Sequence, residues 1–155
     1  MRKTILVISI MALTFCSFGQ ITEKQFIEKI EWLNENPSTS ENTEFVSNSV
    51  DILEFQFLNF PNTPINVSGT KELEKGWHNY KYEKYFIIVY SFNQLYYKIR
   101  NKKYDNLNAC VFSIKKLIKS YTIITENEPE LKIETFEEYK KMSDKELKKR
   151  IKKLL

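Results

Sequence analysis

The sequence predicts an all-α fold: a single-domain helical bundle of four main helices, followed by one or two short C-terminal helices. Three observations predict it: apolar residues recur at helical spacing, capping signals precede several of these runs, and glycine and proline are scarce. The 155 residues include only 3 Gly and 4 Pro, whereas folds built from many short strands use more of both in turns. A content of 42% hydrophobic and 14% aromatic residues is typical of a globular chain.

Residues 1–19 have the layout of a cleaved secretory signal peptide. The parts come in the usual order of positive start, apolar run and small residues before the cut, namely Arg2 and Lys3, residues 5–15, and Ser17 and Gly19. The apolar run of about eleven residues is well short of the ~20 that a transmembrane helix needs. We therefore expect cleavage before Gln20 and export of residues 20–155 as one helical domain, periplasmic or secreted.

Two other interpretations of this segment stay open. In a lipoprotein signal, Cys16 would be lipidated and become the mature N-terminus, although Phe15 stands where such signals have a small residue. The segment could also be a buried N-terminal helix. Removal of 19 residues leaves 136 of the 155 and lowers the formal net charge from +4 to +2. Cys110 is then the one remaining cysteine, so the domain depends on packing rather than on an internal disulfide.

The first two helices are predicted from capping boxes followed by apolar stripes. Thr22–Gln25 is one such box, and Pro37 ends the helix that follows it. Ser38–Glu41 is the second box, and Pro61 and Pro64 end its helix. The residues expected to face the core are Phe26, Ile30 and Leu33 in the first helix and Val46, Val50, Leu53, Phe57 and Phe60 in the second.

Residues 61–76 are expected to be irregular, because they contain prolines, asparagines and Gly69; Gly76 closes the stretch. Residues 85–90 read Tyr-Phe-Ile-Ile-Val-Tyr and have strong strand propensity. The apolar pattern continues over 79–100, however, which is too long for a strand. We therefore predict a central helix there that is apolar on nearly all sides.

The C-terminal part is predicted to hold one long and two short helices. The long one begins near Asp105 or Asn106 and is followed by an acidic loop, 126–130. Thr135–Glu138 and Ser143–Glu146 resemble capping boxes of the two short helices. The inward residues are expected to be Leu107, Cys110, Ile114, Leu117 and Tyr121 in the long helix and Leu147, Ile151 and Leu154 in the last one.

The expected core combines these stripes. It consists of Phe26, Ile30, Leu33, Val50, Leu53, Phe57, Phe86, Val89, Phe92, Tyr96, Cys110, Ile114, Leu117 and Leu147.

Charge is divided between the two ends of the chain: residues 20–76 hold 10 acidic and 4 basic side chains, and residues 140–155 hold 8 basic and 2 acidic ones. The basic helix at 144–154 could dock on the domain or lie on an anionic membrane, and we expect docking, because the domain's own core is tethered to it.

The chain from about 80 to 155 resembles uncharacterised small secreted helical proteins of Bacteroidetes-type bacteria. The resemblance lies in the stretch Tyr90-Ser-Phe-Asn-Gln-Leu-Tyr-Tyr-Lys-Ile-Arg-Asn, the helix 107–121 and the capped, basic C-terminal end. It implies an all-α fold and an envelope location, and no catalytic residue. The same helix pair also resembles a tetratricopeptide hairpin, with Tyr96, Tyr104, Leu107 and Phe112 near knob positions, but its turn length differs and the repeat's small residues are missing.

Few residues suit catalysis or metal binding. The chain has one His and two Cys, and no Gly-rich phosphate loop, CxxC or HExxH motif. His78 is a candidate general base, but we expect a capping turn with Trp77 on the core, because no nucleophile or orienting carboxylate accompanies it. Cys110 is expected to be a buried, inert thiol. We therefore predict no catalytic, cofactor-binding or metal-binding residue.

Two groups of side chains have a functional and a structural interpretation. The acidic residues could form a cation site or a solvated face, and the second is expected, since no ligand loop with a central Gly is present. These residues are Glu126, Glu128, Glu130, Glu134, Glu137 and Glu138. The central aromatic helix could line a cavity for an apolar ligand or form the core, and we expect core. The residues concerned are Tyr85, Val89, Phe92 and Tyr96.

We expect an exported, non-enzymatic helical domain that binds another protein in the bacterial envelope. Export and the absence of a catalytic constellation predict it. A carrier of a small apolar ligand or lipid is the alternative, and an enzyme would need His78 to face an acidic residue in a cleft. No cofactor, nucleic-acid partner or transmembrane helix in the mature chain is expected.

Overall fold

The computed structural model describes residues 21–39, 41–63, 70–101 and 105–155, and every regular element in these ranges is helical. The predicted all-α class is therefore confirmed. The signal segment and the predictions on Pro64, Gly69 and Tyr104 lie outside the described residues. In chain order the elements are α2 (Glu23–Glu35), α3 (Thr43–Asn59), α4 (Lys71–Trp77), α5 (Glu83–Arg100), α6 (Asn106–Asn127), the 3₁₀ helix η1 (Pro129–Leu131), α7 (Glu134–Lys141) and α8 (Asp144–Leu154).

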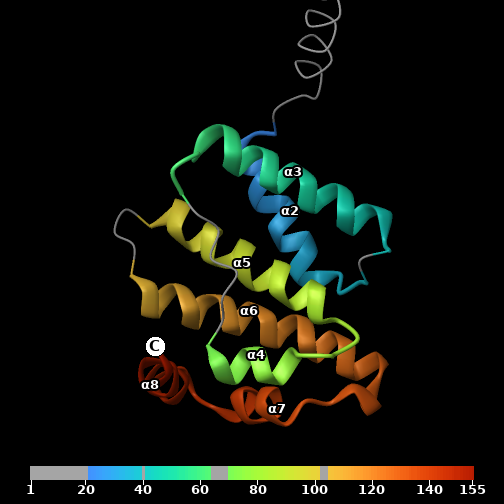
Figure 1. Ribbon diagram of the computed structural model, residues 1–155, viewed down its shortest axis with the longest axis vertical. Helices are drawn as coiled ribbons and strands as arrows, with labels where there is room; N and C mark the ends of the chain where they lie inside the picture. The colour runs from blue at the N-terminus through green and yellow to red at the C-terminus, as the bar shows by residue number, and fades with distance from the viewer. Residues whose placement is uncertain (1–20, 40, 64–69, 102–104) are drawn as a thin grey trace, which may run out of the picture.

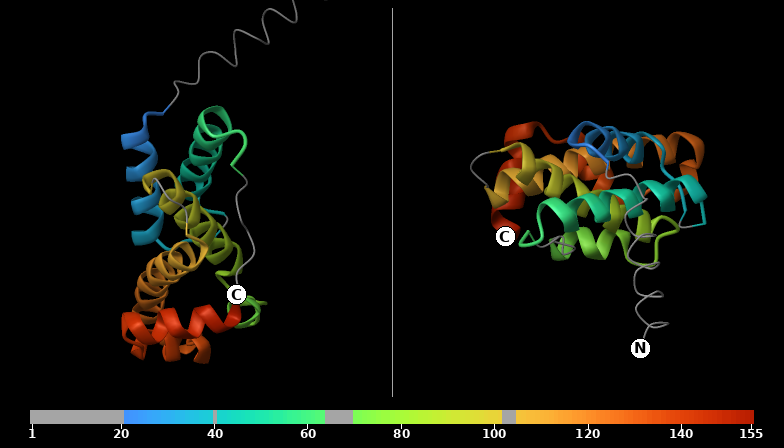
Figure 2. Two further views of the ribbon diagram at one scale, coloured as in Figure 1. Left: turned by 90° about the vertical axis from the view of Figure 1, so that its left-hand side faces the viewer. Right: turned by 90° about the horizontal axis from the view of Figure 1, so that it is seen from above.

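The centre of the molecule is the antiparallel pair α5 and α6, against which α2 packs (Figure 1). α3 lies outside α2, at one end of the helical stack, and α2 is its main neighbour. α4, α7 and α8 gather at the opposite end, as the two views of Figure 2 also show. Within the part of the chain that the structure describes, this order of layers leaves α3 with neighbouring helices on one side only.

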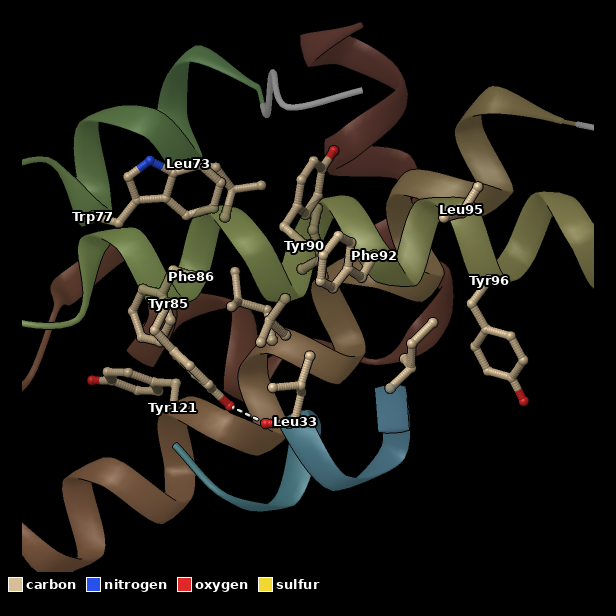
Figure 3. Close-up of a cluster of buried hydrophobic side chains, with 14 of the residues drawn as sticks. Leu33, Leu73, Trp77, Tyr85, Phe86, Tyr90, Phe92, Leu95, Tyr96 and Tyr121 are labelled. Carbon is tan, nitrogen blue, oxygen red and sulfur yellow. Dashed lines mark hydrogen bonds between the residues drawn. The ribbon is translucent and has the colours of Figure 1, made fainter. Parts of the chain in front are cut away.

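Hydrogen bonds with side chains stabilise both ends of α2. Thr22 forms the predicted capping box with Gln25. At the other end, the Leu33 carbonyl accepts a hydrogen bond from the Tyr85 hydroxyl at 2.6 Å, shown in Figure 3, and the Asn34 carbonyl accepts one from the Ser120 hydroxyl at 2.8 Å. The last carbonyls of a helix have no partner within the helix, so α5 and α6 supply the donors that this buried helix end needs.

The side-chain amides of Asn34 and Asn93 form a buried pair between α2 and α5. Asn93 Nδ2 donates to Asn34 Oδ1 at 2.7 Å, and Asn34 Nδ2 donates to Asn93 Oδ1 at 3.3 Å. Both residues are fully buried. We expect Asn93→Ala to lower the free energy of unfolding by about 1–3 kcal/mol, because Asn34 Oδ1 loses its donor in a site without water access. Urea unfolding measures this loss in the free energy of unfolding. An equal loss in the control Asn62→Ala, at an exposed residue, would contradict this account.

Most of the predicted core is buried, including Phe26, Phe86 and Cys110. The prediction is wrong for three residues of α3: Val50, Leu53 and Phe57 are exposed by 54%, 44% and 73%. Val46 on the same stripe is also exposed, and Phe60 is half-buried. The stripe taken for the inner face of this helix is its outer face, for a reason given in the next subsection.

The region 61–76 contains a helix that the sequence did not predict. Thr70 caps α4, its side chain accepting from the Leu73 amide at 3.3 Å. Leu73 and Trp77 bury this short helix against the core (Figure 3). Gly76, expected to close an irregular stretch, lies inside α4 next to Thr135 of α7. A helix of 7 residues is stabilised by such packing rather than by its own propensity.

Two predicted capping boxes are wrong. α3 is capped by Asn42, whose side chain accepts from the Phe45 amide at 2.9 Å, so the box at 38–41 lies before the helix. α7 begins at Glu134 without a side-chain cap, so Thr135 is already inside its first turn. The caps at Asp105 and Ser143 are confirmed.

α8 docks on the domain. Leu147 and Ile151 are buried, and α6 is a main neighbour of this helix. Its lysines point to solvent, as does much of Leu154, which is 37% exposed. This is the docking that the sequence predicts. Among the residues that the structure describes, no helix is long and apolar enough to cross a membrane.

Glu72 connects three of the elements at this end. Its carboxylate pairs with the Arg150 guanidinium of α8 and accepts a hydrogen bond from the Tyr139 hydroxyl of α7 at 2.9 Å. Arg150, followed by the Tyr139 hydroxyl, holds the pKa of Glu72 below its ordinary value of 4.5, against the opposing effect of burial. At any pH at which it is ionised, the Glu72 carboxylate therefore stabilises the folded state relative to the unfolded state.

This contact should contribute to stability at neutral pH and be lost in acid. Because the folded-state pKa of Glu72 is lowered, the contribution is full above the ordinary carboxyl value and declines as pH falls through the folded-state value. We expect Glu72→Gln to destabilise the protein at pH 7 and to differ less from the wild type at pH 3, as followed by thermal melting. The exposed neighbour Glu74→Gln is the control. A destabilisation by Glu72→Gln that does not shrink in acid would contradict the assignment.

Candidate functional site: the outer face of α3

One face of α3 exposes five large apolar side chains, which we call the outer face: Val46, Val50, Leu53, Phe57 and Leu58. Their exposed fractions run from 44% to 73%. The first four are spaced by four, three and four residues, so they form one stripe along the helix. Single exposed apolar residues are common on protein surfaces, but a continuous stripe of them is typical of an interaction site.

The opposite face of α3 is also apolar, and its aromatic rings contact rings of α2 and α5. The Phe55 ring stacks on Phe26 of α2 with 4.6 Å between centroids, and the Phe45 ring contacts Tyr85 of α5 at 5.7 Å. Ile52 between them is fully buried. Phe45 and Phe55 bury more area here than Val or Leu would, so their face turns inward, and the stripe of Val46, Val50, Leu53 and Phe57 turns outward.

Lys29 of α2 also fixes the rotation of α3. Its ammonium group donates to Asn48 Oδ1 at 2.8 Å and pairs with Asp51 Oδ2 at 2.8 Å. Asn48 and Asp51 lie three residues apart, on the side of α3 that faces α2. A rotation that buried Val50 would break both contacts and leave Asn48 without its donor.

The charged side chains of α3 are all acidic. At 3.6 residues per turn, Glu54 lies directly beside the stripe, whereas Glu44 and Asp51 lie further round the helix, toward the face that packs on α2. α3 contains no Lys or Arg. Asp51 is paired with Lys29, whereas Glu44 and Glu54 form no ion pair with the part of the chain that the structure describes. The outer face is therefore an apolar stripe with a negative edge.

His78 lies at the end of α4 and lines a surface hollow of about 490 Å³ together with Glu83, so the expectation that no carboxylate accompanies it is wrong. Its side chain is 70% exposed, with Nδ1 3.4 Å from Glu83 Oε1. Glu83 also accepts the backbone N–H of Asn79 at 3.0 Å, and Asn79 has a positive φ of 60°. Glu83 thus stabilises the tight turn that leads into α5. The helix therefore begins at Glu83 rather than at the predicted residue 79. Trp77 is buried against Tyr90, as the capping-turn interpretation predicts.

Cys110 is buried among polar groups of α5. Its sulfur accepts hydrogen bonds from the Tyr90 hydroxyl at 3.4 Å and from Gln94 Nε2 at 3.7 Å. Burial raises the pKa of the Cys110 thiol, and the two donors oppose that effect only in part. The thiolate is therefore disfavoured, as expected of an inert cysteine.

Two of the six acidic residues near the C-terminal end make structural contacts, and Glu126, Glu130, Glu134 and Glu138 are exposed. Glu128 binds the side chains of Lys81 and Tyr82, and Glu137 accepts from the Tyr121 hydroxyl at 2.8 Å. Among residues 21–39, 41–63, 70–101 and 105–155, no group of three or more His, Cys, Asp or Glu side chains could hold a metal ion.

The aromatic stripe of α5 belongs to the core. Tyr85, Val89, Phe92 and Tyr96 are all buried (Figure 3), and the Tyr96 ring packs edge-on against Phe112. Tyr85 also borders a surface hollow of about 290 Å³ beside Ser38 and Lys81. The packing of the other three residues against their neighbours fits the core interpretation that we expected.

Sequence reasoning identified four of the five residues of the outer face but assigned them to the inner side of the helix, and it did not identify Leu58. The signal that could have found the site is the second apolar face of the same helix, formed by Phe45, Ile52 and Phe55. A helix with two apolar faces, packed at the edge of a bundle, buries one and exposes the other. Comparison of the chain with protein-family models, with curated proteins and with solved structures gave no match.

Proposed function

We propose that this protein is an exported, non-enzymatic helical module that binds another protein of the bacterial envelope through the outer face of α3. The signal-like residues 1–19 support export, and residues 20–155 are treated as the single functional domain. The helices α2, α3, α5 and α6 form its main bundle in this proposal, with α7 and α8 as the short C-terminal helices.

The observation that carries the proposal is the exposure of the five apolar side chains of the outer face. Full burial of one large aliphatic or aromatic side chain contributes roughly 1.5–3 kcal/mol. Since these residues are already about half-buried, docking of a partner would recover part of that value from each of them. The sum is several kcal/mol, enough to offset part of the entropy cost of association.

The chemistry of the surface favours a protein partner. A nucleic-acid site would need Lys and Arg, and α3 has none. An apolar-ligand carrier would need a cavity between helices, whereas Val89, Phe92 and Tyr96 are packed into the core. A catalytic role for His78 would need a site that shields it from water, whereas its side chain is 70% exposed in the surface hollow and the neighbouring Glu83 also accepts the backbone N–H of Asn79.

The proposal is tested by comparing capture of envelope proteins by three forms of the mature protein. The wild type should retain a specific protein, the variant Val50→Gln/Leu53→Gln should lose it, and Leu155→Gln should keep it. Leu155 is a matched control, because it is an exposed leucine at the other end of the molecule. Equal capture by all three forms, or none by any, would contradict the proposal.

Export has its own test. The mass of the protein recovered from cells should correspond to a chain beginning at Gln20. A lipidated chain beginning at Cys16 would place the module on a membrane, and an intact chain beginning at Met1 would overturn export.

A further inference from the structure

We infer that the partner presents an α-helix whose apolar stripe is bordered by Lys or Arg side chains. This inference rests on the proposed function and specifies what binds the outer face of α3. Two properties of that face carry it: the spacing of the apolar residues and the sign of the charge beside them.

The spacing favours a helix as the docking element. Val46, Val50, Leu53 and Phe57 are separated by four, three and four residues, the alternation of a seven-residue repeat. A narrow stripe with this alternation is the seam along which two helices pack by interlocking side chains. The stripe covers twelve residues, and its first and last residues are ~16 Å apart along the helix at 1.5 Å per residue, so a partner helix of about three turns covers it.

The acidic charge beside the stripe specifies which side chains the partner presents next to its own apolar residues. Glu54 borders the stripe, and it forms no ion pair with the described residues. Residues next to a helix–helix seam face the corresponding residues of the partner, and opposite charges there decide which helices pair. Lys or Arg on the partner therefore matches this edge, whereas Asp or Glu would repel it.

A second copy of the chain fits the surface less well. In an antiparallel pair of α3 helices centred between Val50 and Leu53, the two Glu54 carboxylates would lie on one side of the seam, with no basic residue of α3 beside them. The basic helix α8 of another copy is already engaged, since Leu147 and Ile151 are buried in their own domain. An anionic membrane surface would be repelled by the same acidic edge.

The probes for the test are two synthetic amphipathic helices of about three heptads. Both carry Leu on the seam; one has Lys at the flanking positions and the other has Glu at the same positions. Titration of the ¹⁵N-labelled mature protein, followed by NMR, gives the affinity and the residues affected. We expect the Lys peptide to shift α3 resonances and to bind at least ~10-fold more tightly than the Glu peptide.

Two pairs of variants separate the apolar and the electrostatic contributions. Val50→Gln/Leu53→Gln should abolish binding of the Lys peptide, and Leu155→Gln should not. Glu54→Gln should reduce the preference for Lys over Glu to less than ~3-fold. The control Glu134→Gln/Glu138→Gln changes two exposed acids on α7 and should keep the preference.

Three results would overturn the inference. The first is equal binding of both peptides, or tighter binding of the Glu peptide; the second is no shift in α3 with either. The third is a dimer in sedimentation that Val50→Gln/Leu53→Gln dissociates, which would make a second copy the occupant. If stripe-dependent capture of an envelope protein persists in any of these cases, the proposed function stands and only the partner chemistry is wrong.

Discussion

Phe86→Ala is expected to lower the free energy of unfolding by about 3–5 kcal/mol, whereas Phe57→Ala should change it by less than about 0.5 kcal/mol. Phe86 is fully buried, and its ring stacks on Tyr80 at 5.2 Å and meets the edge of Phe136 at 5.3 Å. Truncation leaves a cavity between α5 and α7 that the rigid surroundings fill only in part. The Phe57 side chain is 73% exposed, so its truncation removes little buried area.

The two variants are a matched pair, since the same substitution is made in two long helices. Chemical denaturation monitored by circular dichroism gives both values, provided that the slope with denaturant is unchanged. A similar loss from both variants would mean that the outer face of α3 is buried in solution. The interaction site would then have to be abandoned.

Deletion of residues 143–155 is expected to lower the melting temperature by several degrees or more. Leu147 and Ile151 are buried, and burial of such a side chain contributes roughly 1.5–3 kcal/mol. The deletion also removes Arg150 and leaves the Glu72 carboxylate with only the Tyr139 hydroxyl as donor. For a domain of this size, each kcal/mol corresponds to a few degrees.

The competing role of this helix is binding to anionic membranes. Since Leu147 and Ile151 of α8 face the domain, mainly its lysines and Leu154 would contact the lipid, and we expect the deletion to leave liposome binding at physiological salt nearly unchanged. The double variant Lys152→Gln/Lys153→Gln tests charge without removing the helix and should melt like the wild type. An unchanged melting temperature of the deletion variant, together with lost liposome binding, would show that α8 is a membrane anchor.

The helices with one apolar stripe could be predicted from the sequence. In α2, α6 and α8 a cap precedes residues at steps of three and four, and Ile30, Ile114 and Ile151 are buried as expected. The prediction is wrong at the ends of two stripes, where Leu107 is half-buried and Leu154 is exposed. Local signals decide such a helix, because only one rotation about its axis buries the apolar residues. The fold class follows from them.

The orientation of α3 and the presence of α4 could not be predicted from periodicity. α3 has two apolar faces, and the choice between them is made by Phe26, Lys29 and Tyr85, which lie on other helices. α4 follows a proline- and glycine-containing stretch and is held by Leu73 and Trp77 rather than by local propensity. The candidate site thus depends on tertiary contacts that periodicity within one helix does not contain.

The most direct test of the interaction site is photo-crosslinking in intact cells. A photoreactive phenylalanine derivative at position 50 lies in the middle of the outer face of α3, and the same group at position 145 lies on the exposed face of α8. The proposal predicts a discrete protein adduct from position 50 and none of that mass from position 145. The absence of an adduct at position 50, or the same adduct from both positions, would contradict it.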